Sequence, residues 1–307
     1  MSALDLALPA WAAPYFDGPD AKGKAIVYGL QEDLYHRTKS LISKSSLDKI
    51  AMTPAHYRYH LANPVVPTRA MVTGSALHTV VLEPDLFPRK FVVMPEFGNM
   101  RTNLAKAKRD EWIAEHGAGK TYLTAEEMAT VIGMADSLRM HPTVRILLAD
   151  FEPEVTIVWT DEETGLPCKG RIDALSRYAD GIPVDIKSAR DASESGFMRA
   201  AHNRRYHVQD STYIGGLRAN GHTARNFVLP AVESKPPYAV GVYQFRAPSL
   251  IAGDELRRRD MRMLAKCLKA DHWPGYTENI RDIDIPNYGL AEAENMNNLD
   301  DEDDNDE

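Results

Sequence analysis

Cysteine is scarce in this sequence, and long apolar runs are absent. The two cysteines, Cys168 and Cys267, lie far apart and form no CxxC or Cys/His cluster. This argues against a disulfide framework, a zinc ribbon and an iron–sulfur site. No stretch reaches the roughly 18 consecutive apolar residues that a membrane helix needs, and no basic flank precedes the first apolar residues. We therefore expect a soluble, cytoplasmic protein with no membrane partner.

Motifs of several enzyme classes are also missing. Residues 116–121 end in Gly-Lys-Thr like a phosphate-binding loop, but Ala114 stands where the first glycine belongs. His56 and His60 have the spacing of a helical zinc site, but Tyr57 replaces the glutamate of HExxH. No GxSxG elbow occurs. The sequence thus gives no support to an ATPase, a zinc peptidase or a serine hydrolase.

Acidic charge is concentrated at one end of the chain. The formal net charge is −8, but the segment 291–307 contains nine of the 44 acidic residues and no lysine or arginine. The remaining chain is close to neutral, so the acidic total does not exclude a nucleic-acid partner, which needs only a local basic patch. A basic stretch at 97–121 is either such a DNA-facing surface or an ordinary solvated one.

The 307 residues are enough for one large domain or two modest ones. We expect an irregular arm over 1–29, a single folded domain over 30–288 and a disordered acidic tail over 289–307. Within the domain, a helical part over 30–150 precedes a catalytic core over 151–270. Capping residues and apolar spacing predict helices over 45–61, 74–82, 123–148, 193–219 and 253–269. Short β-branched runs predict strands over 154–159, 169–175, 182–186, 226–232 and 238–245. This order predicts an α/β fold with a mixed sheet.

Two aspartates are expected to face each other across a hairpin. If the turn is centred on Ala179, Asp173 lies opposite Asp185, and Lys187 shares their face because side chains alternate along a strand. Ile172, Ala174, Val184 and Ile186 would then form the opposite, apolar face. Facing carboxylates repel each other, so a cation is expected between them, and Mg²⁺ suits one or two carboxylates plus a phosphate. The alternative is an ordinary cross-strand ion pair between Asp173 and Lys187.

Other residues fit a site at this position, although each also has a structural interpretation. Glu154 begins the preceding strand and would add a carboxylate, or is simply solvated. Gln209 and Tyr213 are four residues apart on one face of a helix, where they reach a phosphate or belong to helix surface and core. His78 is either a metal ligand or a core histidine.

The residues together resemble a known family. The resemblance rests on an ordered set of strings: Ser45-Ser46-Leu47, Thr53-Pro54-Ala55-His56-Tyr57, Gly74-Ser75-Ala76-Leu77-His78, Glu154, Gly170-Arg171-Ile172-Asp173, Asp185-Ile186-Lys187 and Gln209-x-x-x-Tyr213. This set is similar to the exodeoxyribonuclease VIII (RecE-like) branch of the PD-(D/E)XK nucleases, related to the RecB-type nuclease domain. It spans about two thirds of the chain. The resemblance implies a restriction-endonuclease-like core with a central mixed β-sheet flanked by helices.

The resemblance also implies roles for individual residues. His78, Asp173, Asp185 and the main-chain carbonyl of Ile186 would ligate a metal. Lys187 would be the catalytic lysine, acting with Asp185, Asp173 and Glu154. Arg171 would contact a phosphate, and DNA would also be contacted by Gln209, Tyr213, Ser45 and Ser46. The metal would be Mg²⁺, with Mn²⁺ able to replace it.

The implied activity is exonucleolytic digestion of linear double-stranded DNA from its ends, in recombination or phage DNA processing. The family further implies a homo-oligomer that feeds an annealing protein with single strands, in the cytoplasm of a bacterial or phage-infected cell. The acidic tail is outside the family pattern; it would mimic nucleic acid, repel DNA or bind a partner protein. Two alternatives remain: a DNA-binding protein that does not cut or needs a partner to cut, and an endonuclease of the same fold.

Overall fold

The computed structural model describes residues 7–17, 22–63, 65–116, 119–225 and 227–292. Close contacts divide the chain into two units, one ending at Trp273 and the other beginning at Pro274. Residues 287–292 of the second unit are helical, and most of the predicted acidic tail, 293–307, lies outside the described residues. Among the described helices, none is long and apolar enough to cross a membrane.

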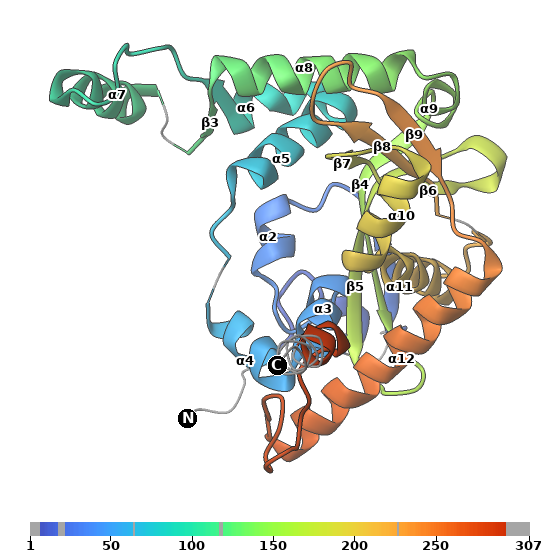
Figure 1. The fold of residues 1–307 in the computed structure, drawn as a ribbon. Helices are drawn as coiled ribbons and strands as arrows, with labels where there is room; N and C mark the ends of the chain where they lie inside the picture. Colours follow the sequence, from blue (N-terminus) through green and yellow to red (C-terminus); the bar gives the residue numbers. More distant parts are fainter. Residues whose placement is uncertain (1–6, 18–21, 64, 117–118, 226, 293–307) are drawn as a thin grey trace, which may run out of the picture. The chain divides into compact units, whose positions relative to one another are not determined.

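A mixed sheet forms the centre of the first unit (Figure 1). Its antiparallel part has the order β1-β4-β5-β6 and consists of β1 (Lys24–Val27), β4 (Phe151–Thr160), β5 (Pro167–Ser176) and β6 (Ile182–Val184). A second group has the order β7-β8-β9 and consists of β7 (Lys187–Ala189), β8 (Leu229–Glu233) and β9 (Val240–Tyr243), with β7 parallel to β8. A parallel bridge between Val184 and Val228 joins the two groups. The predicted mixed sheet is therefore confirmed.

The N-terminal arm differs from the prediction, because β1 lies inside the stretch expected to be irregular. Ile26 pairs with Ile157 of β4, and the strand forms the edge of the sheet. The short apolar run at 25–27 shows no period in a stretch otherwise rich in proline and glycine. Only pairing with β4 gives those residues their strand conformation.

Helices surround the sheet, and three predicted helices are in fact pairs. The N-terminal helices are α1 (Ala13–Phe16), α2 (Glu32–Arg37), α3 (Lys44–Met52), α4 (Pro54–Ala62), α5 (Arg69–Leu82), α6 (Phe87–Lys90), α7 (Asn103–His116), α8 (Ala125–Met140) and α9 (Pro142–Leu147). The later helices are α10 (Glu194–Asn203), α11 (Tyr206–Ala219) and α12 (Ala247–Ala270). Pro54 and Pro142 separate α3 from α4 and α8 from α9, because proline disfavours a helical conformation in the preceding residue. Between α10 and α11, Arg205 is left-handed, with φ of 55°.

Two smaller strands, β2 (Phe91–Val93) and β3 (Thr121–Leu123), pair with each other in parallel. In the sequence, β2 precedes α7 and β3 follows it. The basic stretch at 97–121 contains this helix, on which Lys106 and Lys108 are exposed. Its DNA-facing role stays a prediction.

Apolar packing fixes the sheet between helical layers. The predicted apolar residues Ile172, Ala174, Val184 and Ile186 are all buried. They divide between two clusters, however. Ile172 packs in a cluster that includes Val208 and Leu217 of α11, whereas the other three pack in a cluster that includes residues of α5 and α8.

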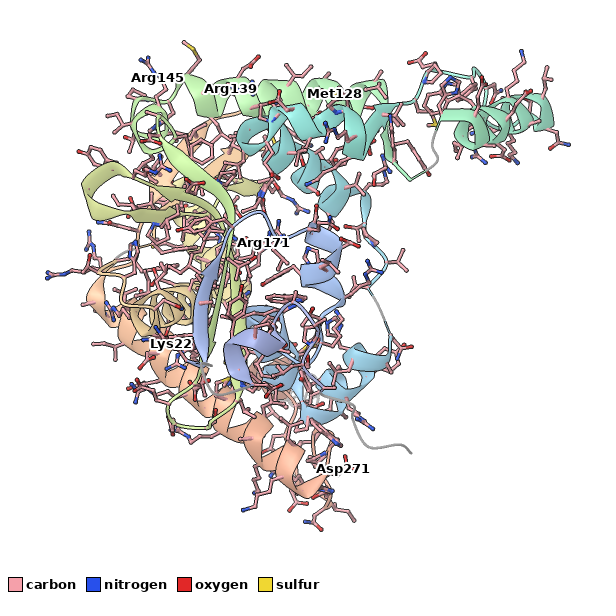
Figure 2. All side chains as sticks on the ribbon, turned by 180° about the vertical axis from the view of Figure 1, so that it is seen from behind. Lys22, Met128, Arg139, Arg145, Arg171 and Asp271 are labelled. Carbon is pink, nitrogen blue, oxygen red and sulfur yellow. The ribbon has the colours of Figure 1, made fainter. Side chains whose placement is uncertain are left out.

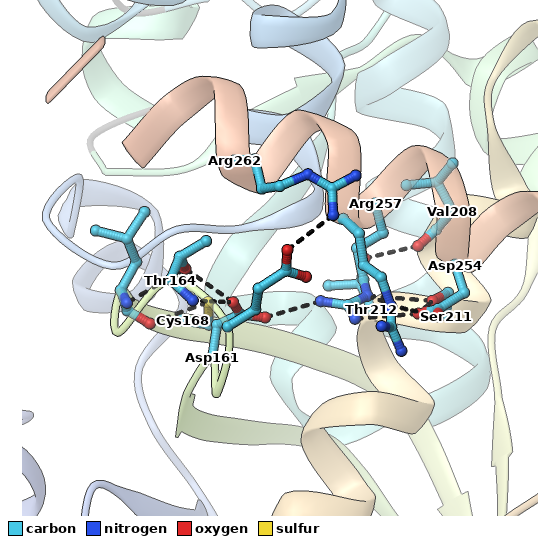
Figure 3. Close-up of polar contacts among 12 residues, drawn as sticks. Asp161, Thr164, Cys168, Val208, Ser211, Thr212, Asp254, Arg257 and Arg262 are labelled. Atoms are coloured by element: carbon cyan, nitrogen blue, oxygen red, sulfur yellow. Dashed lines mark hydrogen bonds and ion pairs between the residues drawn. The ribbon is translucent and has the colours of Figure 1, made fainter. Parts of the chain in front are cut away.

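A polar network ties the β4–β5 turn to the long helix α12 (Figure 3). Arg257 donates to Asp161 of the turn over 2.9 Å and to Asp254 and Ser211 over 3.1 and 3.2 Å. Asp161 in turn accepts from the Thr164 hydroxyl over 2.8 Å. Because Ser211 belongs to α11, the network fixes α11 and α12 against the end of the sheet.

Close packing of α11 on α12 gives a testable stability difference. A Cβ added to Gly253 of α12 would lie 2.2 Å from the main-chain oxygen of His207, whereas at Gly215 of α11 it would meet nothing within 4 Å. Gly253→Ala should destabilise the protein by about 2 kcal/mol or more, because backbone cannot move aside as a side chain can. Gly215→Ala should stabilise it by up to about 1 kcal/mol through helix propensity. Urea unfolding of both variants measures the difference, and equal stabilities would contradict this packing.

Candidate active site and metal cluster

The predicted register of the two aspartates is confirmed. Strands β5 and β6 pair Ala174 with Val184 and Ser176 with Ile182, so Asp173 and Asp185 follow directly beyond the last pair. The predicted strand over 182–186 nevertheless ends at Val184, and β7 starts at Lys187. The chain changes pairing partner at Asp185 and Ile186, where their amides donate to Val228 O over 3.0 Å and to Asp173 Oδ2 over 2.8 Å. The Asp173 carboxylate thus accepts the hydrogen bond of the Ile186 amide at the point where the chain passes from β6 to β7.

Asp185, Lys187 and Gln209 form one half of the site. Lys187 Nζ forms an ion pair with Asp185 and donates to Gln209 Oε1 over 3.1 Å, and Gln209 Nε2 donates to Asp185 Oδ1 over 2.7 Å. Burial alone would lower the pKa of Lys187, but the charges of Asp185, Tyr206 and Asp173 together with the hydrogen bond to Asp185 outweigh burial and raise the pKa. The ammonium therefore stays protonated at neutral pH.

His78, Asp173 and Ile186 form the other half. His78 Nε2 donates to the carbonyl oxygen of Ile186 over 2.9 Å, which leaves Nδ1 facing Asp173 Oδ2 at 3.4 Å. Burial, followed by the nearby charge of Asp185, raises the pKa of Asp173 to about 7. Burial opposes the protonation of His78, but the charges of Asp173, Asp185 and Glu154 together outweigh it and raise the His78 pKa.

Glu154 joins this half through an unusual backbone conformation. Its φ is 49°, and the β4–β5 pairing is interrupted between Glu154 and Asp173. A non-glycine residue held in this region costs about 1–3 kcal/mol, a strain that concentrates at functional sites. Arg171 Nε donates to Glu154 Oε2 over 2.5 Å. One ligand atom each from His78, Glu154 and Asp173 lies within 4.8 Å of the others.

These side chains fit a hard divalent cation. The carboxylate oxygens suit such an ion, and the histidine nitrogen adds a ligand of the kind that first-row transition metals use. Asp185 Oδ2 is buried and contacts the Lys187 ammonium as an ion pair, and the described residues offer it no other polar partner. Of the predicted ligands, His78 and Asp173 belong to the three-residue cluster, the Ile186 carbonyl is bonded to His78, and Asp185 lies in the Lys187 half. Their ligand roles stay predictions.

The remaining predicted DNA contacts lie in different surroundings. Tyr213 is buried, and its ring packs edge-on against Phe227 at a centroid distance of 5.6 Å. Ser46 exchanges hydrogen bonds with Ser43 in a capping box at the start of α3. Ser45 is exposed on the same helix. Ser45 is thus accessible to a ligand, whereas Ser46 has a clear structural role in helix capping.

Two residues beside the site had not been predicted. The centre of the Tyr206 ring lies 4.4 Å from Lys187 Nζ. Lys44 Nζ lies 5.9 Å from the centre of the same ring. Tyr206 is three residues before Gln209 and seven before Tyr213, so helical spacing along α11 was the signal that would have identified it. Lys44 gives no such signal, because α3 meets α11 only through the tertiary fold.

Comparison with known proteins agrees with this architecture. A family model described as a PDDEXK-like domain of unknown function (DUF3799) matches residues 43–285. No curated protein matches the sequence. The crystal structure of a candidate exonuclease from Eubacterium rectale is similar with a TM-score of 0.57 and 13% identity, over 86% of this chain and 98% of that chain. The structure of SSO0001 has 17% identity but a TM-score of only 0.28, over 63% of this chain and 86% of its own, and it bears on no conclusion. At 13% identity, the similarity to the E. rectale structure concerns the fold alone.

Proposed function

Because the chain belongs to the family of PDDEXK-like domains of unknown function, we propose that it is a divalent-metal-dependent nuclease. More specifically, we propose a Mg²⁺-dependent exonuclease that hydrolyses phosphodiester bonds of linear double-stranded DNA from its ends. The observation that carries this proposal is that Asp173 of β5 lies close to Asp185 and Lys187 at the junction between β6 and β7. An ordinary ion pair between Asp173 and Lys187 is not what forms, since Lys187 pairs with Asp185 and Asp173 faces His78.

His78, Glu154 and Asp173 would hold the cation, and Asp185, whose charge acts on both His78 and Asp173, would add a further carboxylate. When bound, a divalent cation polarises the phosphodiester and stabilises the charge that develops on its oxygens. The neutral Nδ1 of His78 would be the coordinating nitrogen, because Nε2 is fixed by its bond to Ile186.

Lys187 supplies positive charge to the reacting phosphate. Its raised pKa keeps the ammonium protonated, so the side chain acts as a charge and hydrogen-bond donor and not as a base. Asp185 and Gln209 hold the ammonium from two sides and thereby orient it before substrate binds.

By the family resemblance, we also propose that the protein works as a homo-oligomer and passes single strands to an annealing protein in recombination or phage DNA processing. Light scattering of the purified protein measures its subunit number. A monomer under conditions that support digestion would contradict the oligomer.

A plasmid supplied in linear and covalently closed circular forms tests the proposed activity. With Mg²⁺, the wild type should degrade only the linear form, because an exonuclease needs an end, and Lys187→Ala should degrade neither form. Degradation of the circle would instead identify an endonuclease. Loss of neither form by the wild type would favour a DNA-binding protein that does not cut alone.

A further inference from the structure

Arg171 is a largely buried cation beside the site, and the proposed chemistry leaves its role open. It lies on β5 two residues before Asp173, and its side chain is only 10% exposed. Figure 2 shows Arg171 near the middle of the unit, whereas Arg139 and Arg145 lie on helices at its edge. An arginine that contacts the DNA backbone would be expected on an open surface.

Protein groups surround most of the Arg171 side chain, which is 10% exposed. Its guanidinium lies 5.5 Å from the centre of the Tyr35 ring, and Nε donates to Glu154. Nη1 is buried and has no hydrogen-bond partner within the described residues. Tyr35 is itself fixed by Lys169, whose ammonium lies 4.1 Å from the ring and also donates to the Tyr35 and Thr38 carbonyls. The guanidinium is therefore held by protein contacts on its Nε edge and against the Tyr35 ring.

Arg171 is instead placed to set the position of Glu154. Glu154 has a left-handed backbone, and the β4–β5 pairing is interrupted between Glu154 and Asp173. Strand pairing therefore does not fix the position of the Glu154 side chain. The bond from Arg171 to Oε2 fixes the carboxylate, and only one of the two oxygens is used for it. The other oxygen is then available to the cluster with His78 and Asp173.

We propose that Arg171 is a positioning residue that holds Glu154 in the metal cluster. The inference rests on the proposed function, because it requires that the cluster bind a cation. Carboxylate ligands are commonly fixed by such hydrogen bonds, and loss of the partner typically weakens metal binding about 10- to 100-fold.

Calorimetry with Mn²⁺ and DNA-free protein tests this role. Arg171→Met should bind Mn²⁺ about 10- to 100-fold more weakly than the wild type. Arg177→Met is the matched control, because Arg177 is an exposed arginine paired with Asp150 and Glu152 at the end of the same strand. That variant should keep wild-type Mn²⁺ affinity.

A double-mutant cycle shows whether Arg171 acts through Glu154. Glu154→Gln alone and Glu154→Gln with Arg171→Met should lose the same Mn²⁺ affinity. Additive losses would overturn the inference. If circular dichroism shows that Arg171→Met is unfolded, Arg171→Lys replaces it; that variant keeps the charge but not the planar fork and should show an intermediate loss.

Binding of a fluorescent linear duplex in EDTA separates positioning from a phosphate contact. Arg171→Met should weaken DNA binding no more than Arg177→Met, which removes the same charge. Unchanged Mn²⁺ affinity together with a specific loss of DNA affinity would overturn the inference in favour of a phosphate contact. If the wild type binds no Mn²⁺, the metal-dependent function itself fails, and the inference fails with it.

Discussion

Replacing Lys187 with alanine should slow phosphodiester cleavage by about 10²- to 10³-fold. The substitution removes the charge that Asp185 and Gln209 hold at the junction of β6 and β7. Asp185 keeps its hydrogen bond from Gln209 Nε2, so the fold should survive. Initial rates on a linear duplex, with circular dichroism of each variant, measure both consequences.

Two further variants show which property of Lys187 matters. Lys266→Ala, on the exposed face of α12, should leave the rate unchanged. Lys187→Arg retains a positive charge and should keep part of the activity if charge is the contribution, whereas a base would be lost entirely. A folded Lys187→Ala protein with a rate within tenfold of the wild type would remove Lys187 from the reaction.

The part of the site that was predictable depends on short-range regularity. The facing of Asp173 and Asp185 follows from strand alternation and one turn centre, and the structure has that register. The capping boxes at the starts of α3 and α8 are likewise local in sequence. Such features need no knowledge of distant parts of the chain.

The unpredicted part depends on contacts between distant segments. The switch of pairing at Asp185 is possible because Val228 receives the main chain there, and nothing near Asp185 in sequence indicates it. The left-handed Glu154 and its bond to Arg171 arise from packing across two strands. The edge strand β1 exists only through β4. Sequence patterns therefore identified most of the charged groups of the site, but not the hydrogen bonds and ion pairs that these groups form with one another.

Replacing Asp173 with asparagine should abolish cleavage and Mn²⁺ binding, yet make the metal-free protein more stable at pH 8. Burial and the neighbouring Asp185 raise the pKa of Asp173 to about 7 in the folded state. This lies above the ordinary value of 3.8, so the folded protein loses stability as the pH rises from about 4 to about 7. Asparagine keeps an oxygen for the Ile186 amide and carries no charge, so it avoids that loss.

Thermal unfolding in EDTA at pH 5 and pH 8 measures this effect. Asp173→Asn should exceed the wild type in melting temperature at pH 8, with a smaller difference at pH 5, where the wild-type carboxyl is protonated. Added Mn²⁺ should raise the melting temperature of the wild type and not that of the variant, because only a site that binds the ion is stabilised by it. Asp136→Asn, at an exposed position on α8, should match the wild type in every condition. A variant less stable than the wild type at pH 8 would show that the Asp173 charge supports the metal-free fold, and the three carboxylates would then not be under mutual repulsion.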